Sequence, residues 1–190
     1  MITQRFNTEL EWRSYWPPNQ SMYGMFQLLE YLEANMPFEE YTQMIEIGSY
    51  MGESACMFAS SNLFNHINCI DPFKGEEDFN DIYGYTWEQI EEEFKLNTRY
   101  FENITHYKNY STEISSRFED NKYDFIYIDG NHEYDAVKKD IELYLPKVKQ
   151  NGFIGGHDYI PHFDGVIKAV NELLGEPDEI FRDYSWIKKI

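Results

Sequence analysis

The chain has 190 residues, of which 34 are Asp or Glu and 16 are Lys or Arg, so its formal charge at neutral pH is -18. This charge repels nucleic-acid backbones and anionic lipids, which argues against a nucleic-acid partner and against a membrane partner. The length is typical of one domain, no apolar run approaches the roughly 20 residues that span a bilayer, and the first residues contain no apolar signal-peptide stretch. We therefore expect one soluble, cytoplasmic domain, with Cys56 and Cys69 as reduced core thiols.

The hydrophobic pattern alternates between helical and strand periods along the chain. A helical stripe over residues 22–32 lies in an N-terminal extension that spans residues 1–40. Five short apolar runs then suit buried strands, at residues 44–47, 67–70, 104–107, 125–128 and 153–155. Helical stripes occupy residues 51–63, 87–101, 137–145 and 163–174. Residues 179–190 predict a closing antiparallel pair of short strands with a turn at 183–185.

Strands that alternate with helices predict an α/β fold, because parallel strands need long crossover connections. We expect a Rossmann-like, doubly wound sheet that is mostly parallel, with helices on both faces and an antiparallel C-terminal strand pair. Ligands of such sheets bind outside the carboxyl ends of the strands. Polar residues follow the predicted strands of this chain, so the functional site is expected along that edge.

Gly48 and Gly52 flank the turn that leads from the first strand into a helix. Glycine lets such a turn bend sharply and approach a ligand, although turn chemistry alone also explains it. Asp71 ends the second strand about 20 residues later, where a carboxylate can accept both hydrogens of a ribose diol or simply cap a helix. The chain has neither G-x-G-x-x-G nor the phosphate-binding P-loop, so phosphate is not the expected ligand.

The segments MIEIGSYMGESACMFA, INCIDPF and YDFIYIDGNHEYDAVKKDIELYLPKVKQNGFIGGHDY resemble the motifs of class I S-adenosylmethionine-dependent methyltransferases. The resemblance covers about residues 44–174 and is nearest to the small-molecule and sugar O-methyltransferases of the macrocin type. It implies a seven-stranded sheet and S-adenosylmethionine as the cofactor. The residues that the resemblance assigns to the cofactor are Glu46, Gly48, Ser49 and Gly52 around its methionine part, Asp71 at its ribose and Ser111 at its adenine.

Asp129, His132, His157 and Asp158 follow two strands that are expected to be neighbours. Carboxylates suit Mg²⁺, Mn²⁺ or Ca²⁺ and imidazoles admit Zn²⁺ or Fe²⁺, so the residue types leave the metal open. The resemblance implies a metal site of Asp129, His157 and Asp158, although relatives often have an acid where this chain has His157, and Mg²⁺ is our first choice. His132 is predicted as the general base and Asp129 as a second catalytic residue. Capping of the next helix is the structural alternative for His132.

Residues 76–102 combine acidic and aromatic side chains, which suits either a solvated face or a lid over the acceptor. Tyr15, Trp16 and Tyr23 form a second aromatic group that either lines the same mouth or packs under it.

The resemblance predicts a single methyltransferase domain over residues 1–190 that methylates a small-molecule hydroxyl, with a sugar among the candidates and a divalent metal assisting. A serine hydrolase is one alternative, because Ser54, Asp129 and His157 occur in the chain order of α/β hydrolases, although Ser54 falls inside a helix. A non-catalytic protein that binds a nucleotide or NAD through Asp71 is another. The acceptor, the choice between O and N methylation, and homo-oligomerisation stay open.

Overall fold

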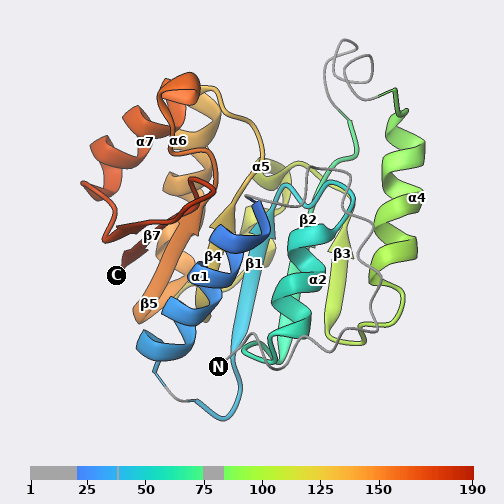
Figure 1. Cartoon of the computed structure of the whole chain (residues 1–190), viewed down its shortest axis with the longest axis horizontal. Coiled ribbons are helices and arrows are strands. Elements are labelled where there is room, and N and C mark those ends of the chain that lie inside the picture. The colour runs from blue at the N-terminus through green and yellow to red at the C-terminus, as the bar shows by residue number, and fades with distance from the viewer. Residues whose placement is uncertain (1–20, 38, 75–83) are drawn as a thin grey trace.

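The computed structural model describes residues 21–37, 39–74 and 84–190. A seven-stranded sheet in the order β3-β2-β1-β4-β5-β7-β6 runs through it (Figure 1). The strands are β1 (Gln43–Ile47), β2 (His66–Ile70), β3 (Ile104–Tyr107), β4 (Tyr123–Ile128), β5 (Val148–Gly156), β6 (Glu179–Ile180) and β7 (Trp186–Lys189). Strands β1 to β5 pair in parallel, and β7 is antiparallel to both β5 and β6. The structure thus confirms the predicted Rossmann-like α/β sheet and its antiparallel C-terminal pair.

Helices cover both faces of the sheet, as predicted (Figure 1). The helices are α1 (Ser21–Asn35), α2 (Glu53–Ser60), α4 (Trp87–Thr98), α5 (Ser111–Ile114), α6 (Tyr134–Tyr144) and α7 (Asp164–Leu174), with short 3-10 turns η2 (Ser115–Arg117), η3 (Leu145–Lys147) and η4 (Pro161–Phe163). Helices α1, α2 and α4 share one core with alternate strand residues such as Met44 and Phe125. Helices α5, α6 and α7 share the other core with Ile45 and Ile126. Successive side chains of a strand point to opposite faces of the sheet, so each of these strands contributes to both cores.

Helix α4 belongs to the core, because its residues Ile90 and Phe94 are fully buried. It begins with a capping box, in which Thr86 and Gln89 exchange hydrogen bonds between side chain and backbone N–H. The second half of the predicted lid is therefore a packed helix, whereas residues 76–83 lie outside the described residues. Tyr15 and Trp16 also lie outside them. No helix of the described part is long and apolar enough to cross a membrane.

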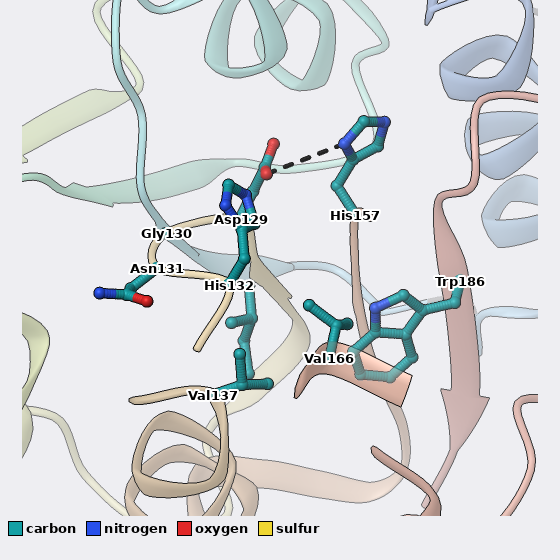
Figure 2. Close-up of a pocket in the computed structure, with 9 residues that line it drawn as sticks. Asp129, Gly130, Asn131, His132, Val137, His157, Val166 and Trp186 are labelled. Atoms are coloured by element: carbon teal, nitrogen blue, oxygen red, sulfur yellow. Dashed lines mark ion pairs between the residues drawn. The ribbon is translucent and has the colours of Figure 1, made fainter. Parts of the chain in front are cut away.

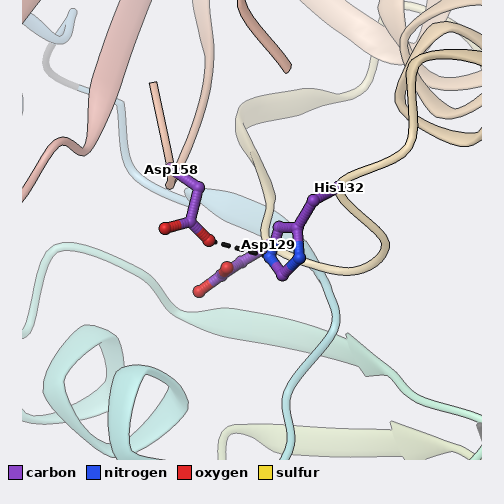
Figure 3. Close-up of side chains that lie close together, drawn as sticks. All are labelled: Asp129, His132 and Asp158. Carbon is purple, nitrogen blue, oxygen red and sulfur yellow. Dashed lines mark ion pairs between the residues drawn. The ribbon is translucent and has the colours of Figure 1, made fainter. Parts of the chain in front are cut away.

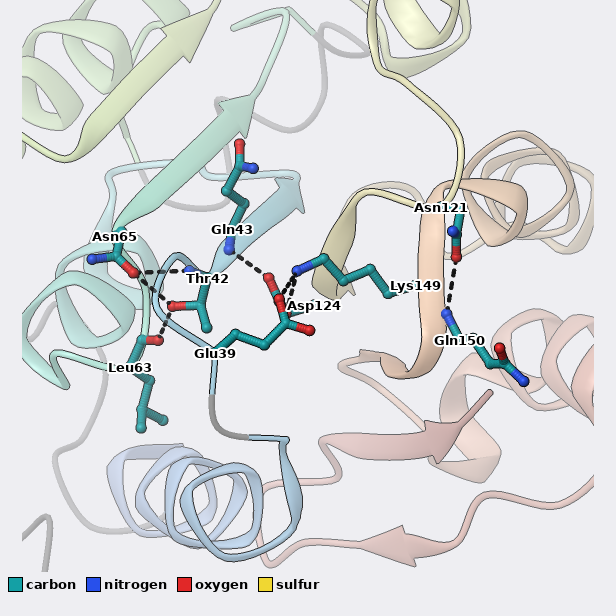
Figure 4. Close-up of polar contacts among 9 residues, drawn as sticks. All are labelled: Glu39, Thr42, Gln43, Leu63, Asn65, Asn121, Asp124, Lys149 and Gln150. Carbon is teal, nitrogen blue, oxygen red and sulfur yellow. Dashed lines mark hydrogen bonds and ion pairs between the residues drawn. The ribbon is translucent and has the colours of Figure 1, made fainter.

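The amino-terminal edge of the sheet is held by a buried acid on β4 (Figure 4). The carboxylate of Asp124 accepts a hydrogen bond from the backbone N–H of Gln43 at 2.7 Å and from Nζ of Lys149 at 2.9 Å. Lys149 also pairs with Glu39. Asp124 thus joins β1, β4 and β5 at the edge opposite to the predicted site.

Replacement of this acid tests its contribution to stability. We expect Asp124→Ala to lower the free energy of unfolding by about 2 to 4 kcal/mol, because it leaves the backbone N–H of Gln43 without its acceptor and takes from Lys149 the buried one of its two carboxylate partners. Urea denaturation measures the change. Lys122→Ala is the control, since its pair with Glu119 lies on the surface and is worth less than about 1 kcal/mol. Equal effects of the two substitutions would contradict this role of Asp124.

Candidate active site

The loops after β1, β2, β4 and β5 lie next to one another at the carboxyl edge of the sheet. Backbone hydrogen bonds fix their order: the N–H of Gly48 donates to the carbonyl of Ile70 at 2.9 Å, and that of Asp129 donates to Ile47 at 2.7 Å. The N–H of His157 donates to the carbonyl of Ile128 at 3.1 Å. Most of the predicted site residues therefore gather along one edge.

Asp71 is the polar centre of the first two loops. One carboxylate oxygen accepts the backbone N–H groups of Ser49 at 3.0 Å and Tyr50 at 2.8 Å, and the other accepts the N–H of Phe73 at 2.7 Å. Burial raises the pKa of Asp71, while these three hydrogen bonds lower it. A carboxylate offers about four acceptor positions, so Asp71 orders both loops and keeps capacity for one ligand hydroxyl.

The structure gives the two predicted glycines a packing reason. Gly48 has a φ of +84°, and a Cβ there would lie 2.0 Å from the carbonyl oxygen of Asp129. Gly52 also has a φ of +84°, caps α2 and would bring a Cβ within 3.0 Å of the Phe94 ring. The glycine loop is therefore pressed between the β4 loop and α4.

Glu46 lies fully buried beneath this loop. Its Oε2 accepts the hydroxyl of Ser49 at 2.6 Å and the thiol of Cys69 at 3.4 Å. Its Oε1 is buried without a hydrogen-bond partner among the described residues. Burial raises the pKa of Glu46 to about 7, although the hydroxyls of Ser49 and Ser54 lower it. The loop thus covers an acceptor that a cationic group of a ligand would satisfy.

Ser111 is less available than the sequence suggested. It begins α5 after β3, but its hydroxyl donates to the buried carboxylate of Asp140 on α6. Its carbonyl accepts the hydroxyl of Tyr144 at 2.8 Å. The side chain of Ser111 is thus used inside the protein, and its role at adenine stays a prediction.

The loops after β4 and β5 bring together the four predicted catalytic and metal residues, three of which, Asp129, His132 and Asp158, are drawn in Figure 3. Nε2 of His132 lies 2.8 Å from Oδ2 of Asp158. Nδ1 of His157 lies 3.2 Å from Oδ1 of Asp158 and 3.9 Å from Oδ1 of Asp129. Asp129, His132 and Asp158 each have one potential ligand atom, and these three atoms lie within 4.8 Å of one another. Asp158 therefore bridges two imidazoles, and Asp129 faces the same space.

Opposite charges in this cluster stabilise one another, whereas the two carboxylates and the two imidazoles each repel their like. The hydrogen bond to Asp158 raises the pKa of His132. Burial works against the charged form of His157, but the carboxylates of Asp129 and Asp158 raise its pKa to about 9. The two imidazoles hold the pKa of Asp158 well below its usual range, against the effect of burial, whereas burial raises that of Asp129. The cluster therefore favours the charged forms of its two imidazoles and of Asp158.

A small cavity lies against this cluster (Figure 2). Asp129, His132 and His157 border one side, and the apolar side chains of Val166 and Trp186 border the other. Trp186 on β7 is fully buried, and its indole nitrogen has no hydrogen-bond partner among the described residues. The C-terminal strand thus supplies a wall of the site.

Several side chains at the site carried no signal in the sequence. The ring of Phe163 stacks on His132 with centroids 4.3 Å apart and planes at 28°. Asp183 is buried in the turn before β7. Its charge raises the pKa of His157, though less than the charges of Asp129 and Asp158 do. A Cβ on Gly24 of α1 would lie 2.0 Å from the carboxylate of Asp183, so α1 closes over this acid. Gly24 precedes the first quoted motif, and Phe163 and Asp183 follow the last one, which ends at Tyr159.

Ser54, the nucleophile of the hydrolase alternative, lies in the first turn of α2, as expected. A nucleophile elbow needs its serine at a tight turn directly after a strand. The turn after β1 is instead made by Gly48 and Gly52. The local geometry therefore does not support a serine nucleophile.

The close approach at Gly48 predicts a large cost for a side chain there. We expect Gly48→Ala to lower the free energy of unfolding by about 2 kcal/mol or more, since it combines a positive φ with a collision against the β4 loop. Gly84→Ala is the matched control, because Gly84 has a φ of +73° but no atom within 4 Å of its Cβ position. Its expected cost is about 1 kcal/mol. Similar costs in urea denaturation would argue against the packing role.

The raised pKa of Glu46 predicts a pH dependence of stability. The folded chain keeps the proton up to about pH 7, whereas the unfolded chain releases it near 4.5. The stabilisation is therefore present below pH 4.5 and is lost as the pH rises through 7. We expect Glu46→Gln to gain stability over the natural chain between these pH values by up to about 3 kcal/mol. A pH-independent difference in unfolding free energy would exclude this effect.

Comparisons with known proteins agree with this geometry. Residues 45–159, more than half of the chain, match the family described as a methyltransferase domain. The chain is 30% identical over 161 residues to an uncharacterized protein of Acanthamoeba polyphaga mimivirus, in a match that covers 80% of this chain and 67% of that protein.

Two solved structures show the same fold at low sequence identity. Apo CalS11, a TDP-rhamnose 3'-O-methyltransferase of calicheamicin biosynthesis, has a TM-score of 0.64 at 14% identity and covers 88% of this chain and 79% of its own. An rRNA methylase from Streptococcus thermophilus has a TM-score of 0.60 at 11% identity and covers 86% of this chain and 93% of its own. With its glycine loop and the acid after β2, the chain thus belongs to the class I S-adenosylmethionine-dependent methyltransferases.

Proposed function

We propose that this protein methylates a hydroxyl of a small molecule, with a sugar hydroxyl as the first candidate and a divalent metal ion assisting. The observation that carries the proposal is the group of Asp129, His132, His157 and Asp158 directly beside the glycine loop. Such a group can take a proton from an acceptor and orient its oxygen.

The residues around the glycine loop fit S-adenosylmethionine. The unpartnered Oε1 of Glu46 suits the amino group of its methionine part, and Asp71 has acceptor capacity for its ribose. Gly48 and Gly52 allow the backbone of the glycine loop to approach the cofactor closely. The acidic surroundings favour its sulfonium cation. When bound, the cofactor supplies an electrophilic methyl group.

His132 is the proposed general base. Its imidazole is held through Nε2 by Asp158 and on its ring face by Phe163, so its orientation is set before an acceptor arrives. Methyl transfer needs little beyond an acceptor oxygen held about 3 to 3.5 Å from the methyl carbon and freed of its proton. The proposed metal ligands are Asp129, His157 and Asp158, and their ion would supply charge stabilisation and orientation.

The acceptor is the least constrained part of the proposal. The fold occurs both in the sugar O-methyltransferase and in the rRNA methylase, so it does not choose between them. The formal charge of -18 opposes a polyanionic acceptor. A base held beside two acids suits a hydroxyl, which must lose a proton on methylation. These points favour a small-molecule hydroxyl.

The proposed domain organisation keeps the sequence assignment. Residues 1–190 are proposed as one methyltransferase domain with an N-terminal extension over 1–40. Within the proposed lid over 76–102, the buried Ile90 and Phe94 anchor α4 in the core, so this part of the segment is a packed helix.

Titration calorimetry with S-adenosylhomocysteine tests the cofactor half of the proposal. We expect micromolar binding by the natural chain, no binding of NAD, and at least about tenfold weaker binding by Asp71→Asn, which loses one acceptor but keeps the shape. Asp129→Asn is the control and should bind as the natural chain does. Unchanged binding by Asp71→Asn would contradict the assignment.

Turnover tests the chemical half. With radiolabelled S-adenosylmethionine and a panel of acceptors that includes TDP-rhamnose, we expect His132→Ala and Asp129→Asn to lose about 10² to 10⁴-fold in kcat while they keep S-adenosylhomocysteine binding. Full turnover of His132→Ala at neutral pH would exclude His132 as the base.

A further inference from the structure

The proposed metal site differs from a carboxylate site in the donors that it presents. Two imidazoles turn a ring nitrogen toward the carboxylates of Asp129 and Asp158: His132, seen in Figure 3, and His157, seen beside Asp129 in Figure 2. All four come from the loops after β4 and β5, which backbone pairing holds side by side. Any ion held by both carboxylates therefore meets at least one imidazole nitrogen.

The donor set decides which ions suit the site. Mg²⁺ prefers six oxygen ligands, loses its water reluctantly and gains little from imidazole. Mn²⁺, Fe²⁺, Co²⁺ and Zn²⁺ accept mixed sets of carboxylate oxygen and imidazole nitrogen, and their affinity rises in the Irving–Williams order. Two oxygens and one nitrogen thus favour a transition-metal ion or zinc.

His157 offers one nitrogen to both acids. Its Nδ1 lies 3.2 Å from an oxygen of Asp158 and 3.9 Å from an oxygen of Asp129, and Figure 2 shows its ring beside Asp129. Ligands about 2.1 Å from a common ion lie about 3 to 3.5 Å apart, close to this spacing. One ring nitrogen of His132 also lies within 4.8 Å of a carboxylate oxygen of Asp129 and of Asp158, and the His132 ring stacks on Phe163.

We propose that Asp129, His157 and Asp158 select a first-row transition-metal ion or zinc over Mg²⁺. This inference deepens the metal half of the proposed function and replaces the Mg²⁺ expected from the sequence. Nδ1 of His157 faces both carboxylates, and we assign the metal preference to this nitrogen donor. His132 then stays available as the base.

Metal binding by the full chain, stripped with EDTA, tests the proposal without an acceptor or turnover. Calorimetry with CoCl₂, ZnCl₂, MnCl₂ and MgCl₂ alone should give Co²⁺ and Zn²⁺ affinities at least about a hundredfold above that for Mg²⁺. The Co²⁺ complex should show visible absorption bands that change when its nitrogen ligand is removed. Equal affinities for Co²⁺ and Mg²⁺ would overturn the proposal.

Three variants assign the preference to one side chain. His157→Asp should lower the ratio of Co²⁺ to Mg²⁺ affinity by about tenfold or more and shift the Co²⁺ bands. His132→Ala should leave that ratio within about twofold, and the exposed His162→Asp should leave it unchanged. Loss of the preference in His132→Ala but not in His157→Asp would overturn the assignment of His157.

The outcome is separable from that of the proposed function. Failure to bind S-adenosylhomocysteine or to methylate any acceptor would contradict the proposed function but leave the metal preference intact. Methyl transfer with a site that prefers Mg²⁺ would support the proposed function and refute the preference.

Discussion

The carboxylate of Asp71 is the interaction on which the functional edge depends. It takes two backbone N–H groups from the loop after β1 and one from the loop after β2, and so ties together the two loops that surround the proposed cofactor. Burial of an acid is costly, and these three hydrogen bonds offset part of that cost, since the pKa of Asp71 stays above its usual value. With Asp71 in place, the glycine loop is held against the β4 loop, and the distance between the cofactor residues and the acid–imidazole cluster is fixed.

Backbone strain collects at the same edge. Tyr50, Phe73 and Asp158, which follow β1, β2 and β5, all have positive φ values, of 45°, 45° and 61°. Such conformations persist in bulky residues only where the surroundings enforce them, and they concentrate at functional sites. Here the N–H groups of Tyr50 and Phe73 reach Asp71, and Asp158 reaches two imidazoles. The strained conformations thus allow these hydrogen bonds to Asp71 and these ion pairs of Asp158 to form.

The sheet, and the polar residues that follow its strands, could be predicted from the sequence. Runs such as 125–128 are apolar on both faces, so their period and length identified buried parallel strands, and the polar residues after them had to share an edge. Contacts that depend on tertiary arrangement were beyond its reach. The hydroxyl of Ser111 is taken by Asp140, 29 residues later in the chain. Phe163 and Asp183 reach the cluster only because α7 and the final hairpin fold back beside β5, and no motif marks either residue.

The position of β7 in the sheet affects how the chain folds during translation. It inserts between β5 and β6, although it follows β6 in the chain, and it brings Trp186 to the wall of the cavity. A nascent chain that has emerged only as far as Asp158 contains all the residues assigned to cofactor, base and metal, yet β5 still has an open edge and the cavity lacks one side. Because domains generally fold as units during translation, we expect the complete sheet and cavity to form only after residues 186–189 have left the ribosome. Until then, the open edge of β5 is a site where chaperones or a neighbouring nascent chain can pair.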